Sequence, residues 1–153
     1  MKNKVYNSKG LNKSDLLMVI INGLSMTLIL AVAVAAFNLV TILGMQYIFA
    51  PSLLLIAYFL PKSIRKSYED YHIAYSIIAI ILFLIGYYIS NVIIVSFLGG
   101  IKAGFSLGNL RSTFMIFWPF TKAFYNFATI ILLIVVVISM VMCYKISRPS
   151  IKE

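Results

Sequence analysis

The sequence predicts an all-α integral membrane protein, a bundle of four transmembrane helices with both termini in the cytoplasm. Hydrophobic residues make up 62% of the 153 residues and charged residues only 11%. A soluble domain is typically about half apolar and about a quarter charged, so this composition excludes an ordinary soluble enzyme. A mean hydropathy of +1.00 would also leave more apolar surface than a soluble fold of this size can bury.

The first two helices are expected within residues 16–60, which contain no charged side chain. A helix crosses the hydrocarbon core with about 20 apolar residues, so this run is too long for one span and suits two. We place the turn between them at Asn38–Gln46, where polar residues and a glycine interrupt the apolar pattern. Pro51 then falls early in the second helix, and Pro61 ends that helix before a cytoplasmic loop at 61–72.

A third helix begins near Ile73 and ends at Gly99-Gly100, so residues 16–98 hold three spans with their cytoplasmic loop. The fourth helix is expected at 123–144, whose centre is almost purely aliphatic. A short polar and basic tail, 145–153, follows it.

The distribution of basic residues predicts the orientation. With four spans, ten of the thirteen Lys and Arg residues fall on one side, in the N-terminal segment 1–15, the loop 61–72 and the tail 145–153. Because cytoplasmic segments carry the excess of basic residues, both termini are expected in the cytoplasm. The many isoleucine, lysine and asparagine residues further suggest a bacterial plasma membrane and an AT-rich genome.

The segment 99–122 joins the third and fourth helices on the opposite side. It combines four glycines with several aromatic residues, among them Trp118, and carries Lys102 and Arg111. Two such basic residues make a full span costly. We expect an interfacial or re-entrant segment, with aromatic rings at headgroup depth and basic groups in water or on phosphate.

Small residues recur every fourth position along the first helix. These residues form a smooth ridge that lets another helix approach closely. The spacing fits packing inside the bundle and docking onto a partner protein equally well, so both interpretations stay open. The ridge consists of Gly23, Thr27, Ala31 and Ala35.

Polar but uncharged residues occur within the expected spans. Asn22, Asn91 and Asn126 fit hydrogen bonds between helices, and they also fit a polar path for a neutral solute. No Asp, Glu, His, Lys or Arg falls inside the four spans, and secondary active transporters usually keep such a group in the membrane. Autonomous active transport is therefore not expected.

The sequence offers little for catalysis. Glu69 and His72 are three residues apart, a spacing that can share a metal, but no second His or Cys pair completes a site. Acidic residues here fit a helix N-terminus instead. Motifs for phosphate binding and for hydrolytic or metalloprotease chemistry are missing as well. We therefore expect no enzyme activity, no catalytic residues, no metal site and no cofactor.

The expected function follows from what is left. We expect a non-enzymatic subunit of an envelope or transport complex, assembling with other membrane proteins or with itself in the lipid bilayer. One alternative is a small oligomeric passive transporter or pore for a neutral or anionic solute, with Lys102 and Arg111 at its mouth. A second is a bacteriocin-immunity or holin-like membrane protein. Because the basic residues mark orientation, no nucleic-acid partner is expected.

Overall fold

The computed structural model describes residues 11–44, 52–109, 111 and 127–149. These residues are helical apart from short turns, and three of their helices are long and apolar enough to cross a membrane. The three candidate spans are Lys13–Val40, Ile73–Gly99 and Ile130–Ser147. The described chain therefore has the helices of a multi-pass membrane protein. Its elements are α1 (Lys13–Gly44), α2 (Leu53–Lys66), α3 (Ile73–Gly99), α4 (Ile101–Gly104) and α6 (Phe127–Ser147).

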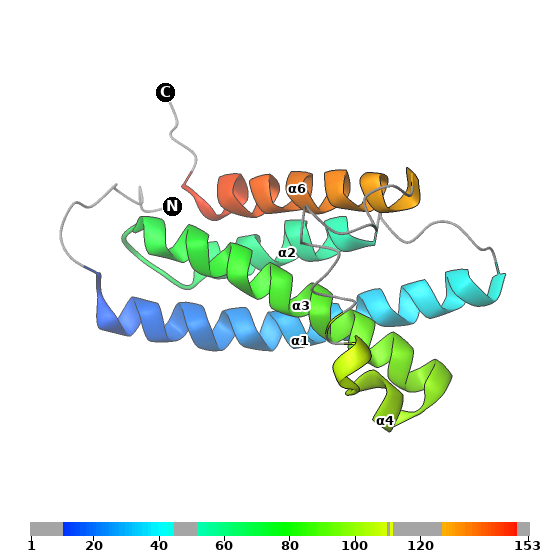
Figure 1. Ribbon diagram of the computed structural model, residues 1–153. Coiled ribbons are helices and arrows are strands. Elements are labelled where there is room, and N and C mark those ends of the chain that lie inside the picture. Colours follow the sequence, from blue (N-terminus) through cyan, green and yellow to red (C-terminus); the bar gives the residue numbers. More distant parts are fainter. Residues whose placement is uncertain (1–10, 45–51, 110, 112–126, 150–153) are drawn as a thin grey trace.

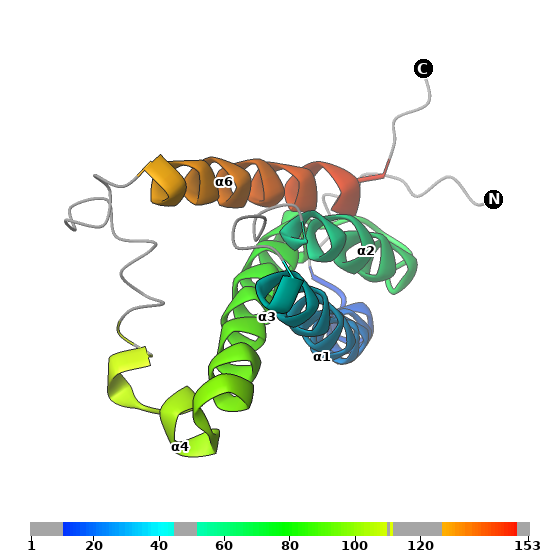
Figure 2. The ribbon, with the colours of Figure 1, turned by 90° about the vertical axis from the view of Figure 1, so that its right-hand side faces the viewer.

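The four longer helices pack side by side with alternating directions. In Figure 1, α1 and α3 run one way, and α2 and α6 return the other way. At one end of the bundle α1 begins, residues 67–72 join α2 to α3, and α6 finishes. We call this the terminal end. Contacts link α1 with α2 and α3, and link α6 with the same two helices. Figure 2 shows that α3 and α6 diverge toward α4.

The turn expected at Asn38–Gln46 is wrong for residues 38–44, because α1 continues to Gly44, and residues 45 and 46 lie outside the described part of the chain. Asn38 lies inside the helix and is buried. The Ser52 hydroxyl donates a hydrogen bond to Asn38 Oδ1 at 2.8 Å. Since this bond satisfies the amide within the protein, Asn38 does not need the water that a turn would give it. Pro51 lies outside the described residues.

The prediction that Pro61 ends the second helix was wrong, since α2 continues through it to Lys66. A proline has no N–H, so it leaves the carbonyl four residues earlier, that of Ala57, without its helical partner. The Cys143 thiol of α6 lies 3.8 Å from the Ala57 oxygen and donates a weak hydrogen bond to it. A side chain of a neighbouring helix thus supplies a partner for the carbonyl that Pro61 leaves without one.

Helix α3 begins at Ile73 and ends at Gly99, in agreement with the helix expected there. His72 precedes it in an extended conformation, and its Nδ1 accepts a hydrogen bond from the Ala74 N–H at 3.1 Å. Gly100 follows with a φ of 87°, a left-handed value that glycine adopts without strain. The chain turns sharply there into α4.

Helix α6 extends one turn beyond the expected end at Tyr144, to Ser147. Lys145 lies in this last turn, where a positive charge interacts favourably with the free carbonyls. Residues 123–126, the expected start of the helix, lie outside the described part of the chain.

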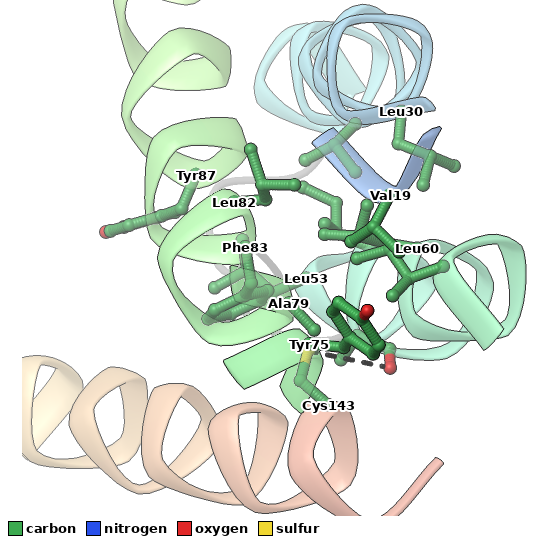
Figure 3. Close-up of a cluster of buried hydrophobic side chains, with 14 of the residues drawn as sticks. Val19, Leu30, Leu53, Leu60, Tyr75, Ala79, Leu82, Phe83, Tyr87 and Cys143 are labelled. Atoms are coloured by element: carbon green, nitrogen blue, oxygen red, sulfur yellow. Dashed lines mark hydrogen bonds between the residues drawn. The ribbon is translucent and has the colours of Figure 1, made fainter. Parts of the chain in front are cut away.

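The core lies between the four longer helices. Figure 3 shows Phe83 and Tyr75 of α3 near Leu53 of α2 and Cys143 of α6, with Val19 of α1 nearby. All five side chains are almost fully buried. Large apolar residues on the outward faces of α1, α2, α3 and α6 are exposed instead, as expected of surfaces that contact lipid.

Candidate functional site

The ridge on α1 crosses α3 at a point where both helices carry a glycine. A Cβ added at Gly86 of α3 would lie 3.1 Å from Thr27 Cγ2, and one added at Gly23 would overlap Leu82 Cδ1. Each glycine therefore accommodates a side chain of the other helix. This close approach maximises van der Waals contact, which drives helix association in membranes where the hydrophobic effect contributes little.

All four ridge residues lie inside the protein. Thr27, Ala31 and Ala35 have no exposed surface, and Gly23 is buried as well. The Thr27 hydroxyl donates to the Gly23 carbonyl at 2.7 Å, so the ridge also exposes no unsatisfied polar group. A partner protein could reach this face only after α1 and α3 separated.

A second cluster joins the end of α6 to the start of α3 at the terminal end. Tyr68 donates its hydroxyl hydrogen to the Ser147 carbonyl. The Ser147 hydroxyl donates to Ser76 Oγ at 2.8 Å, and Ser76 also shares a hydrogen bond of 2.9 Å with the Tyr71 hydroxyl. Arg148 Nε donates to that same Tyr71 oxygen at 3.2 Å. We call these five residues the terminal network.

Aromatic rings enclose the terminal network. Tyr68 stacks on Tyr75 with ring centroids 4.9 Å apart, and Tyr71 lies 6.0 Å from Tyr68. The Arg148 guanidinium lies 4.0 Å from the centre of the Tyr144 ring and also donates to the Tyr144 hydroxyl. Because Tyr68 and Tyr71 are each 2% exposed, the hydrogen bonds that they make with Ser147 and Ser76 are shielded from water.

The chemistry of the terminal network is structural. Burial raises the pKa of Tyr68 above its ordinary value of 10.0, and the nearby Arg65 charge only partly offsets this. The phenol therefore stays protonated at physiological pH, so it acts as a hydrogen-bond donor and not as a nucleophile or base. The network's hydrogen bonds hold the end of α6 against residues 67–72, which join α2 to α3, and against the start of α3.

The raised pKa of Tyr68 predicts a loss of stability at alkaline pH. Below pH 10 the phenol is protonated in both the folded and unfolded states, so its contribution is fully present. Above pH 10 the unfolded state releases the proton first, and the stabilisation falls as pH approaches the folded-state pKa. Thermal unfolding in detergent between pH 9 and 11 should show this decline. Tyr68→Phe should make this decline smaller, whereas Tyr58→Phe, at an exposed tyrosine, should leave it unchanged.

Of the polar residues just before α3, His72 caps the helix through its Nδ1, as described above. Glu69 and Asp70 are exposed, and the Glu69 backbone N–H donates to Asp15 Oδ2 at 3.3 Å, which joins this loop to the start of α1. In the described part of the chain, no three His, Cys, Asp or Glu residues lie close enough to hold a metal ion.

Two of the three asparagines proposed for a polar path, Asn22 and Asn91, lie toward different ends of the bundle. Asn22 Nδ2 donates to Ser67 Oγ at 3.0 Å near the terminal end. Asn91 Nδ2 donates to the Tyr87 carbonyl of its own helix at 3.1 Å, toward the other end of α3. Asn126 lies outside the described residues. The two described asparagines thus belong to different ends of the bundle and each has a hydrogen-bond acceptor.

The basic residues proposed for the outer loop lie beyond α3. Lys102 is exposed within α4, and Arg111 is exposed a little further along the chain. Trp118 falls outside the described ranges.

The terminal network was not predicted from the sequence. One signal was present: Tyr68, Tyr71 and Tyr75 are spaced by three and four residues, although Tyr68 and Tyr71 lie in the segment before α3 and only Tyr75 lies in the helix. The partners of Tyr68 and Tyr71 at the end of α6, Ser147 and Arg148, come from the other end of the chain, so no local pattern connects them.

Comparisons with known proteins give no relative for this chain. No protein-family model matches it, and neither a curated protein nor a solved structure shows significant similarity.

Proposed function

We propose that the chain crosses the membrane four times and that its terminal end faces the cytoplasm of a bacterial cell. Direct contacts support the number of crossings. Gly23 of α1 packs against Leu82 of α3, and Thr27 packs against Gly86. Because the residue numbers of both helices increase in the same direction across these contacts, α1 and α3 run parallel. If both helices cross the membrane, the chain between them must return across it.

Helix α2 is positioned to make this return. Its N-terminal Ser52 bonds Asn38 of α1, and Ser67 at its other end bonds Asn22. Asn22 and Asn38 are separated by about 24 Å of helix at about 1.5 Å per residue. The α2 helix covers most of this distance in the opposite direction, and the uncharged residues 45–51 precede it in the sequence.

The basic residues support the orientation. Six described Lys and Arg residues lie at the terminal end, against Lys102 and Arg111 beyond the far end of α3. Because positive charge marks the cytoplasmic side, the terminal end is assigned to the cytoplasm. The six residues are Lys13, Lys62, Arg65, Lys66, Lys145 and Arg148.

Within this topology, we propose that the protein is a non-enzymatic subunit that assembles with other membrane proteins or with further copies of itself. One observation carries this proposal. The interior polar side chains mostly bond to each other or to backbone, as in the terminal network, while the outward helix faces are apolar. The apolar outward faces are suited to contact with other membrane proteins, and few polar side chains of the described residues are free to take part in a reaction.

The test is a tagged purification in mild detergent, followed by mass spectrometry and measurement of the molar mass. A stoichiometric membrane-protein partner or a defined homo-oligomer is expected. Ala36→Trp on α1 and Ile138→Trp on α6 each enlarge an exposed side chain without filling the core. One of the two should weaken assembly and the other should not, which would map the assembling face.

A monomer that purifies without any partner would contradict the subunit proposal. If a homo-oligomer is found, solute flux into liposomes decides whether it is a passive pore. A flux that falls on Lys102→Ala would support the pore and its anion-attracting mouth.

A further inference from the structure

We propose that the segment from Phe97 to Leu107, here called the hook, is an anchor that lies in the phospholipid interface. Its apolar side chains enter the edge of the hydrocarbon core, and Lys102 binds headgroup phosphate. The inference requires only that α3 crosses the membrane, and it does not depend on any protein partner.

The hook carries the most exposed apolar side chains among the described residues of this region. Phe97 is 71% exposed, Ile101 75%, Phe105 67% and Leu107 83%. These values exceed those of the outward residues in the middle of α3, such as Ile81 at 50%. A cluster this exposed is costly in water and needs an apolar environment.

The fold holds the hook at the depth where the interface begins. The 27 residues of α3 measure about 40 Å, and about 38 Å at a tilt of 20°, so the helix exceeds a hydrocarbon core of about 30 Å. At Gly100 the chain reverses, and Gly104 packs back against Ser96. The hook therefore returns to the level of the last turns of α3 and does not project into water.

Gly104 makes this return possible. A Cβ at this position would overlap Ser96 Oγ and lie 2.8 Å from the Val92 carbonyl oxygen. The carbonyl belongs to the helix backbone and cannot move away as a side chain can. Asn109 Nδ2 donates to the Gly104 carbonyl at 2.9 Å, so a residue that follows the hook also holds Gly104 in place.

The occupant is assigned from chain continuity, exposure and charge. Exposed apolar side chains of α3, among them Ile77, Ile81 and Ile85, would face lipid if the helix crosses the membrane. Phe97 and Leu98 are exposed in the last turn of the same helix, and Ile101 is exposed just beyond it. Lys102 is exposed in α4, and residues 97–111 contain no acidic side chain, so the region complements the negative phosphate layer.

The test places a polarity-sensitive nitrobenzoxadiazole probe at Phe105→Cys in the full-length chain, with Cys143→Ser as background. The protein is reconstituted into vesicles of phosphatidylethanolamine and phosphatidylglycerol. Lipids with a nitroxide near the headgroup should quench the probe strongly, and aqueous iodide should quench it weakly. A probe at Lys66→Cys, on an exposed residue at the end of α2, serves as the water-facing control.

Matched glycine variants test the packing. Gly104→Ala should release the hook, so that lipid quenching falls and iodide quenching rises. Gly108→Ala should change neither, because its nearest atom, Ser106 Oγ, lies 3.9 Å from the added Cβ. Lys102→Glu should reduce lipid quenching in phosphatidylglycerol vesicles, whereas Lys102→Arg should retain it.

Two outcomes would overturn the proposal. Strong iodide quenching in the parent chain would place the hook in water. Protection from both iodide and lipid nitroxide would mean that protein, such as a second copy, covers it. Folding of each variant is checked by size-exclusion chromatography, and Gly104→Ser, which adds one atom more than alanine, provides a second disrupting change.

Discussion

Gly86→Leu is expected to prevent stable packing of α1 against α3. The first added carbon already lies 3.1 Å from Thr27 Cγ2 and 3.6 Å from Ile56 Cδ1, and leucine adds three more. Overpacking a tight core costs about 1–3 kcal/mol and sometimes more. Here the two helices must separate, so the contacts of the buried ridge are lost as well. Fluorescence-detected size exclusion and thermal unfolding in detergent should show loss of the monodisperse protein.

The control for this prediction is Ala33→Leu. Ala33 lies on the exposed face of α1, two residues from the buried Ala31, so the added side chain meets lipid or detergent. We expect near-native stability from it. A finer test pairs Gly86→Ala with Thr27→Ser, which deletes the Cγ2 methyl group. If the second change does not recover stability lost in the first, the proposed contact between α1 and α3 is wrong.

Ser76→Ala is expected to loosen the end of α6. The change removes the hydrogen bonds that Ser147 and Tyr71 make with Ser76 Oγ, both in a buried site. Loss of a buried partner costs about 1–3 kcal/mol. Cys143 lies one turn before Ser147 and is fully buried, so its reaction with a maleimide reports local opening of α6. A loss of about 1–3 kcal/mol corresponds to a rise of about 5- to 150-fold in the labelling rate.

Ser139→Ala is the matched control. Ser139 is as fully buried as Ser76, but its hydroxyl has no hydrogen-bond partner among the described residues. Removing an unsatisfied buried hydroxyl should leave stability unchanged or raise it. Equal labelling of Cys143 in both variants would show that the terminal network does not hold α6.

The sequence was informative where a helix is defined by its own residues. The apolar run after His72 and the Gly99-Gly100 pair located α3 within one residue of its observed ends. The ridge residues that the sequence singled out are buried in the structure. Their spacing could not identify the opposing surface, because Leu82 and Gly86 come 59 residues after Gly23 and Thr27 in the chain.

The errors share one physical origin. Asn38 and Pro61 are residues that usually end a helix, and both lie inside one here. Each leaves a polar group that water would normally satisfy, and each is satisfied by a distant side chain, Ser52 in one case and Cys143 in the other. Such partners are fixed by tertiary packing and are not visible in a local window. The same holds for the bonds between Tyr68 and the end of α6.

The most direct test of the account is the side of the membrane on which each helix ends. Single cysteines are introduced at Lys13, Lys66, Lys102 and Lys145 in the Cys143→Ser background, and intact cells are treated with a membrane-impermeant maleimide. All four positions are exposed in the protein. With four crossings and a cytoplasmic terminal end, only the cysteine at position 102 should react before permeabilisation. Reaction of the cysteines at 13 and 66 from opposite sides would show that α2 does not cross, and would contradict the four-span topology.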